Sequence, residues 1–283
     1  MDTARAVAGE VNVGAGARLE LSFERRAGRT VLARSYAEPP FRVGPALDVD
    51  GAAYLILVCT GPGIFGGDDV RLSIHVGRGA RVVLTSQSAL QVHPSADRSM
   101  AHIRQNFRID EDGELIAEWD PAIPFAGARL DQRIAIDLAA GTRLLWSDAV
   151  MSGRAGRGES WRFASLAHEL AARTDGSLAY LERYRLTPDR RPARTWMAGQ
   201  AHYAGTVLVA HAGATPGAAT GLHATLQSAG GEGTSAGADL VQEGLLVARL
   251  LSASGRCFAA AREAARVAVL ESIFGRAAGV KRK

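Results

Sequence analysis

The amino-acid sequence predicts an all-β protein with few helices, organised as a single layered domain over residues 1–283. Three observations support this prediction. Side chains alternate between apolar and polar along most of the chain, glycine-containing breaks separate the alternating runs, and one alanine-rich stretch near the C-terminus departs from the pattern. With 283 residues and 47% hydrophobic content, the chain can bury a large core.

The strand prediction begins with ARLELSFE, in which Leu19, Leu21 and Phe23 point to one side. Further runs of this kind are YLILVCT, DVRLSIHV, ARVVLTSQ, AHIRQNFRI, ELIAEW, QRIAIDL, RLLWSDAV, WRFASLAHEL, SLAYLERYRL, AHYAGTVLVAH and DLVQEGLLVARLL. Breaks such as DEDG and RTDG are typical of hairpin turns, because a residue with positive φ matches the twist of the flanking strands. We therefore expect many short strands.

Three segments depart from this rhythm. We expect a flexible N-terminus over residues 1–16 and a Gly/Ser-rich surface loop over 228–239. The stretch 256–275 predicts the main helix, because Phe258, Ala261 and neighbouring apolar residues recur at helical spacing up to Gly275.

The charge and cysteine content favour a cytoplasmic protein with no membrane or nucleic-acid partner. The net charge is +4, but lysine occurs only at 281 and 283, and the arginines are spread along the chain among acidic residues. Cys59 and Cys257 have no metal-ligand spacing and outline no disulfide framework. We find no secretory signal pattern and no apolar stretch of membrane-spanning length.

The segment GPGIFG, residues 61–66, has the glycine spacing of a dinucleotide-binding turn. Such a turn must open a helix, whose N-terminal N–H groups hold the phosphates. Here the alternating run DDVRLSIHV follows, which predicts a strand. We therefore predict that residues 61–67 form a tight, partly buried turn without a bound nucleotide.

Read through to Asp68, GPGIFGGD resembles the glycine-rich signature of the urease accessory protein UreD (UreH) family. Four later stretches resemble that family in the same order: ARVVLTSQSALQVHPS, ELIAEWDPAIPFAGA, RLLWSDAVMSGRAGRGE and EGLLVARLLSASGRCFAAAREAARVAVLESIFGRAA. Together they cover most of residues 17–278. The resemblance implies strands in a layered, helicoid-like or sandwich arrangement.

The resemblance also implies a non-catalytic metallochaperone scaffold. Proteins of this family bind UreF, recruit UreG through it and dock on apo-urease, so that nickel reaches the urease active site. No tightly bound cofactor is implied, only transient nickel, and a homodimer within the accessory complex is compatible with this role. We expect the helix at 256–275 to contribute to the UreF surface, with Arg262 and Arg266 at its rim. The alternative is that this helix simply covers the sheet.

Four acidic residues fall at positions that match family motifs: Asp68, Glu118, Asp148 and Glu159. Carboxylates attract a divalent cation but, taken singly, do not trap it as thiolates would. The hypothesis is that the four residues line or gate an internal polar path for nickel. The competing interpretation makes each a turn cap or an ion-pair partner, with Arg154 the obvious partner for Glu159 or Asp148.

Two other classes of function are weighed against the scaffold. A β-rich glycoside hydrolase would use Glu118 and Asp148 as acid and base, but aromatic residues are only 6% of the chain, which provides few sugar platforms. A β-structured binding module without a metal role is the other alternative. The histidines, among them His93 and His168, have no local metal-ligand spacing and are interpreted as ordinary side chains.

Overall fold

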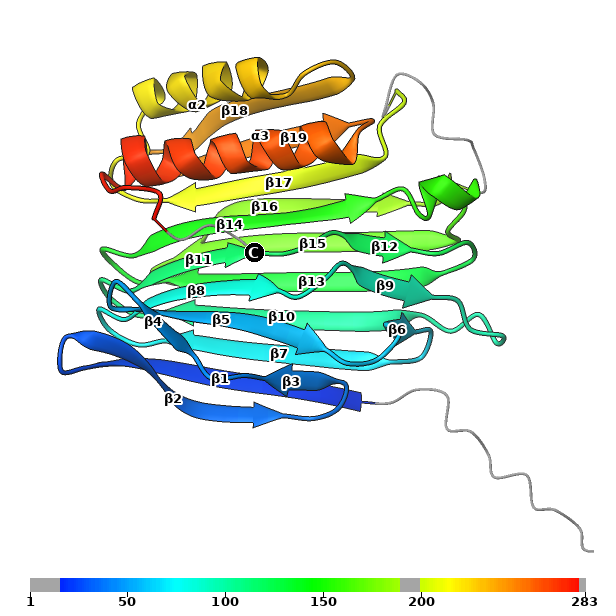
Figure 1. Ribbon diagram of the computed structural model, residues 1–283, viewed down its shortest axis with the longest axis horizontal. Helices are drawn as coiled ribbons and strands as arrows, with labels where there is room; N and C mark the ends of the chain where they lie inside the picture. The colour runs from blue at the N-terminus through cyan, green and yellow to red at the C-terminus, as the bar shows by residue number, and fades with distance from the viewer. Residues whose placement is uncertain (1–15, 189–198, 280–283) are drawn as a thin grey trace, which may run out of the picture.

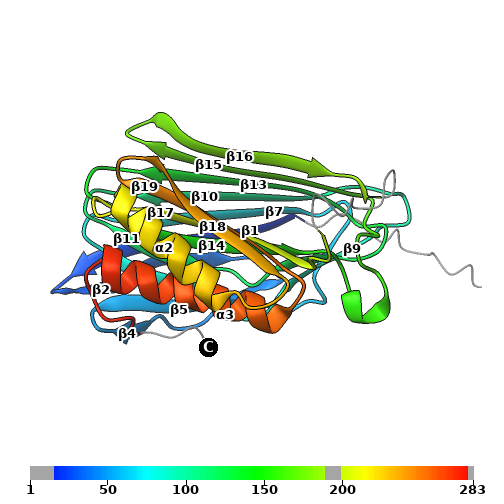
Figure 2. The ribbon, with the colours of Figure 1, turned by 90° about the horizontal axis from the view of Figure 1, so that it is seen from above.

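The computed structural model describes residues 16–188 and 199–279, which form two β-sheets packed face to face, with helices on the outside of one sheet (Figure 1, Figure 2). The expected flexible N-terminus falls on residues outside the described part, except for Gly16, which begins the first strand.

Sheet A has seven strands, of which the central five are parallel and the two edge strands antiparallel. In spatial order they are β16 (Ser177–Leu186), β15 (Ser165–Thr174), β13 (Arg129–Leu138), β10 (Ala101–Ile109), β7 (Asp69–Val76), β1 (Gly16–Arg26) and β2 (Arg29–Ala37).

Sheet B is larger and mixed, with a parallel centre. In spatial order its main strands are β18 (Thr234–Gln242), β19 (Leu245–Ser252), β17 (Tyr203–Ala210), β14 (Arg143–Met151), β11 (Glu114–Glu118), β8 (Arg81–Ser86), β5 (Ala52–Cys59) and β3 (Phe41–Val43). Four short strands join it: β4 (Leu47–Val49), β6 (Ile64–Phe65), β9 (Leu90–His93) and β12 (Ala122–Pro124).

The chain winds between the two sheets. From β7 onward it passes to β8 in sheet B, returns to β10 in sheet A, and continues through β11, β13, β14 and β15 in the same alternation (Figure 1). Successive strands of one sheet are parallel, because each turn of the chain re-enters from the same end. The predicted layered, β-dominated fold is confirmed.

Two apolar cores hold these layers. The larger one fills the space between the sheets, and there Leu19, Leu21 and Phe23 are buried on one side of β1 as predicted. Phe107 and Trp146 meet in this core with ring centroids 4.9 Å apart. The second core lies between sheet B and the helices. The central strands of sheet B are therefore covered on both faces.

The predicted C-terminal helix is confirmed as α3 (Gly255–Ala268), which continues as a π-helical turn (Val269–Ile273). The Ser254 side chain accepts a hydrogen bond from Cys257 N and caps the start of α3. After the π-helical turn Gly275 adopts φ +66°. Within the described residues, no helix combines the length and apolar character needed to cross a bilayer.

The predicted loop at 228–239 is wrong, because it contains the end of a second helix and most of an edge strand. Helix α2 (Pro216–Ala229) begins at the Thr215 cap with Pro216 in its first turn, and β18 starts at Thr234. One glycine of this segment serves packing: a Cβ on Gly230 would lie 2.9 Å from Thr234 Cγ2. Composition alone suggested a loop, but pairing with β19 makes it a strand.

The glycine segment forms the predicted turn between β5 and β7, with the short strand β6 inside it. A strand follows it, as expected. Gly63 has φ +130°, and a Cβ there would lie 2.3 Å from the carbonyl oxygen of Gln91. At Gly66 a Cβ would lie 2.5 Å from both Ser95 Oγ and Ser99 O. Glycine is therefore required at both positions by close approach of the backbone to its neighbours.

Replacement of Gly66 by alanine should lower the free energy of unfolding by about 2 kcal/mol or more, because the loop must shift away from Ser95 and Ser99. Gly61→Ala is the matched control, since its Cβ meets only Pro40 Cβ at 3.4 Å. Urea unfolding of both variants measures the difference. Equal stabilities would contradict the packing role of Gly66.

Candidate functional site

The four acidic residues that the sequence singled out do not converge in the structure. Asp148 lies on β14 and faces the space between the sheets, together with Trp146. Glu118 is also buried, but it points to the opposite side of sheet B, beneath α3, where Arg266 Nε lies 3.9 Å from its Oε2. Asp68 and Glu159 lie in loops.

Asp68 and Glu159 each have a local structural partner. Asp68 Oδ2 accepts a hydrogen bond from Phe65 N at 2.8 Å and so closes the glycine turn. Glu159 forms a two-pronged pair with the guanidinium of Arg154, as the sequence suggested, and accepts a further bond from Ala126 N. The pair with Arg154 lowers the pKa of Glu159 below its usual value.

Glu118 and Asp148 cannot act together as the acid and base of a glycoside hydrolase. The two side chains lie on opposite faces of sheet B, so a sugar bond cannot be flanked by both. The residues first weighed for that alternative therefore do not form an active site.

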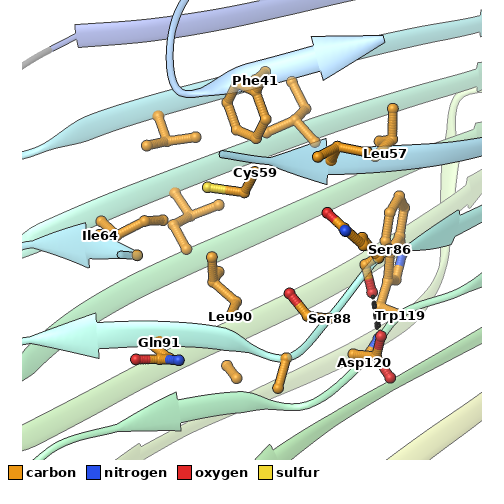
Figure 3. Close-up of a pocket in the computed structure, with 18 of the residues that line it drawn as sticks. Phe41, Leu57, Cys59, Ile64, Ser86, Ser88, Leu90, Gln91, Trp119 and Asp120 are labelled. Atoms are coloured by element: carbon orange, nitrogen blue, oxygen red, sulfur yellow. Dashed lines mark hydrogen bonds between the residues drawn. The ribbon is translucent and has the colours of Figure 1, made fainter. Parts of the chain in front are cut away.

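A cavity of about 140 Å³ lies between the two sheets at the end where the glycine segment packs (Figure 3). Its walls come from both sheets and from Gly61, Pro62 and Gly63 of the glycine turn. Figure 3 shows Cys59, Ile64 and Leu90 around the cavity, with Ser86 bonded to Asp120 at its side. The glycine segment therefore forms one wall of a partly open pocket between the sheets.

The lining of this cavity becomes polar toward Asp148. Gln105 and Gln132 contribute from sheet A, and Asp148 contributes from sheet B. Gln105 Oε1 is buried without a hydrogen-bond partner among the described protein groups. Most of the remaining lining is apolar, so these three side chains provide the amide and carboxylate oxygens with which the cavity could contact a cation.

Beyond the cavity, buried polar side chains continue between the sheets. In sheet A, Gln132, His168 and Tyr184 occupy neighbouring register positions on β13, β15 and β16. In sheet B, Asp148, Thr206 and Arg249 likewise occupy neighbouring register positions on β14, β17 and β19. We call this set, together with Glu182, the inner polar line.

Glu182 of β16 connects the two sheets within the inner polar line. Its carboxylate accepts hydrogen bonds from Thr206 Oγ1 at 3.0 Å, from Arg249 Nη1 at 2.8 Å and from the Tyr180 hydroxyl at 3.0 Å. Glu182 is only 6% exposed, whereas the side chain of Arg249 is 55% exposed. The inner polar line therefore runs from the cavity to the surface at Arg249.

Burial raises the pKa of Asp148 above its usual value. The nearby His168 opposes this rise and the negative charge of Glu182 adds to it. An ionised Asp148 is thus costly in this position, and a cation beside it would reduce that cost. Chemically, the arrangement offers separate oxygen and nitrogen ligands in succession: Asp148, His168 and Glu182.

His168 and Glu182 were not among the candidate residues predicted from the sequence. His168 is 5% exposed, its ring stacks on Tyr184, and its Nδ1 has no hydrogen-bond partner among the described protein groups. Glu182 could have been found from the alternation of side chains along β16, which places it on the same side of the strand as the buried Tyr180. In the part of the chain that the structure describes, no group of three or more His, Cys, Asp and Glu side chains is arranged to hold a metal ion.

The expectation that Arg262 and Arg266 line the rim of an interface is wrong. They are 8% and 2% exposed and face the sheet. Arg262 donates to Ser147 Oγ at 2.9 Å and to the Trp119 carbonyl at 3.0 Å, which ties α3 to β14 and to the end of β11. These arginines therefore hold the helix on sheet B.

The raised pKa of Asp148 makes a pH-dependent prediction. Below its ordinary pKa of 3.8 the carboxyl is neutral in both the folded and the unfolded state, so it contributes no pH dependence. As pH rises from there through the raised pKa, the unfolded state ionises first and the folded state loses stability relative to it. Asp148→Asn removes this titration. The gain in stability of the variant over the parent should therefore grow with pH, by at most about 1.4 kcal/mol per pH unit.

Urea unfolding at a series of pH values, followed by tryptophan fluorescence, measures this difference. Glu159→Gln is a control of opposite sign: the lowered pKa of Glu159 stabilises the fold above its usual pKa, and this contribution disappears as pH falls. Parallel pH profiles for the parent and Asp148→Asn would contradict the assignment of Asp148 as a costly buried acid.

Comparisons with known proteins identify the family to which this chain is similar. Residues 15–283 match the family described as UreD urease accessory protein. Relatives named urease accessory protein UreD include one from Deinococcus radiodurans, 29% identical over 94% of both chains, and one from Ralstonia nicotianae, 35% identical over 70% of this chain and 68% of the relative. Another, from Sorangium cellulosum, is 36% identical over 60% of this chain. That match spans only 54% of the Sorangium protein.

The match to the family extends over nearly the whole chain, and it includes the glycine turn, both sheets and the C-terminal helix. The chain therefore belongs to the UreD urease accessory protein family.

Proposed function

We propose that this chain is a non-catalytic accessory protein of urease maturation, which helps nickel to reach apo-urease. The family membership supports the link to urease, because relatives carry the name urease accessory protein. The observation that supports a role with nickel is the buried Asp148, which lies beside the cavity between the sheets at the start of the inner polar line.

Nickel is the cargo in this proposal, and the inner polar line is its route. A divalent cation entering the cavity would meet amide oxygens first and then Asp148, His168 and Glu182 in turn. Each position offers few ligands, so the ion would be held weakly and passed on. Because ionising Asp148 is costly, a cation bound to it would be held weakly and released readily.

The expected partners are UreF, UreG through UreF, and apo-urease, in a cytoplasmic complex in which this chain can form a homodimer. A UreF contact in the C-terminal region would use the outward sides of α2 and α3, since Arg262 and Arg266 are engaged with sheet B. Asp68, Glu118 and Glu159 are not part of the inner polar line, and a contact of any of them with nickel is a separate prediction.

Asp148→Asn should lower nickel loading of urease by about tenfold, which corresponds to about 1.4 kcal/mol of lost cation stabilisation. The variant keeps size and hydrogen-bonding capacity but removes the charge. It is co-expressed with apo-urease and the other accessory proteins, and the nickel content and urea hydrolysis of the purified urease are measured. Co-purification of UreF reports whether the scaffold itself is intact.

Glu111→Gln is the matched control, because Glu111 is exposed in the turn between β10 and β11, paired with Arg78, and carries the same charge. It should load urease normally. Full loading by Asp148→Asn would show that Asp148 is not on a nickel route and would favour a binding module without a metal role. Loss of UreF binding by Asp148→Asn would instead assign the residue to the stability of the scaffold.

A further inference from the structure

The outer face of sheet A carries a row of arginines that the linear sequence does not show. The registers of six neighbouring strands place one residue of each side by side on this face. In order from β1 to β16 these residues are Arg18, Arg71, Arg104, Arg133, Glu169 and Arg183. Five of the six positions are arginine, and we call these five the arginine row.

No helix of the described residues covers this face. Both α2 and α3 pack on the other side of the molecule, over sheet B (Figure 2). The side chains of the arginine row are 42% to 65% exposed. Their neighbours along each strand, such as Val70 and Leu72, point into the core.

Carboxylates beneath the arginine row hold its guanidinium groups in place. Asp69 Oδ2 lies 2.7 Å from Arg71 Nη2, and its Oδ1 lies 2.6 Å from Arg104 Nη1. Glu169 pairs in the same way with Arg183 at 2.8 Å. The two acids are only 34% and 29% exposed, so the guanidinium ends form the outermost layer.

This arrangement prepares the arginines for a partner. Each guanidinium has five N–H donors, and a pair with one carboxylate leaves some of them free. Because the carboxylates already restrict the side chains, less conformational entropy is lost when a second acidic group binds. The surface therefore presents a line of oriented guanidinium groups that still have N–H donors available for an acidic partner.

The spacing of the line indicates the kind of partner. Neighbouring strands are about 4.8 Å apart, and an α-helix advances about 5.4 Å per turn. A helix that lies across the strands with one carboxylate per turn would place a carboxylate near each of the four consecutive arginines from Arg18 to Arg133. The long arginine side chains can bridge the small difference in spacing. In an extended strand, residues on the same side are about 6.7 Å apart, so its carboxylates would match the spacing of the arginines less well than those of a helix.

We propose that the arginine row is a docking surface for a partner protein that presents an α-helix with a stripe of carboxylates. The flanking acids argue against a nucleic acid. Asp69, Glu169 and their neighbour Asp131 lie under the same face and would repel a continuous chain of phosphates. Individual carboxylates between the arginines avoid this repulsion.

The probe is an alanine-based helical peptide of roughly 20 residues with glutamates in a single stripe, one per turn. A second peptide has the same composition, with the glutamates distributed around the helix. Binding of both to the parent protein is measured at low ionic strength, where exposed charges are least screened. The striped peptide should bind at least about tenfold more tightly than the distributed one, and added salt should weaken it.

The triple substitution Arg71→Gln/Arg104→Gln/Arg133→Gln should lower the affinity for the striped peptide by about tenfold, because three exposed ion pairs between protein and peptide are lost. The matched control is Arg108→Gln/Arg173→Gln/Arg185→Gln, which removes the same charge from the same sheet but outside the row. It should change binding no more than about twofold.

Three results would overturn the proposal: equal binding of the two peptides by the parent protein, an equal loss in both triple variants, or tighter binding of a single-stranded oligonucleotide than of the striped peptide. The comparison of the two peptides uses the parent protein only, so it remains decisive even if a triple variant folds poorly.

Discussion

Each turn of this winding chain adds one strand to sheet A and one to sheet B, and each new strand must pair in register with the strand that the previous turn added to the same sheet. The rest of the structure depends on that constraint. The pairings from β1 through β7, β10, β13 and β15 are parallel and uninterrupted. Since side chains alternate along a strand, a slip of one residue would exchange the two faces. The apolar core, the inner polar line and the arginine row are all consequences of one shared register.

Within that register, Asp148 is placed where an apolar side chain would stabilise the fold more. Its neighbours on the same face of β14, Trp146 and Val150, are both part of the apolar core. Glu182 is compensated by three hydrogen bonds, whereas the raised pKa of Asp148 shows that its burial remains costly even with His168 nearby. Local conflict with the fold is expected at functional positions, because there selection acts on the site and stability is sacrificed.

The sequence predicted most strands of sheet A, the glycine turn and α3, because each has a local pattern. The sequence did not show that Asp148 and Glu118 lie on opposite faces of sheet B. Strands β11 and β14 are buried on both faces, so apolar and polar residues do not alternate along them in a way that identifies each face. Helix α2 was not predicted, because glycine, threonine and alanine dominate that helix, although Thr215-Pro216 is a recognisable start. The arginine row was not visible, because its members are brought together only by pairing between distant strands.

The two outer faces of the molecule differ in how their arginines are used. Over sheet B, Arg262 and Arg266 are buried and fix α3 to the strands, so removal of the helix would leave the buried Glu118 without the positive charge of Arg266. Over sheet A, the arginines point outward and keep free donors. Within residues 16–188 and 199–279, helices thus cover the outer face of sheet B, whereas no helix covers the outer face of sheet A. For a scaffold proposed to contact several proteins, this separation lets one partner dock on sheet A without displacing another from the helices.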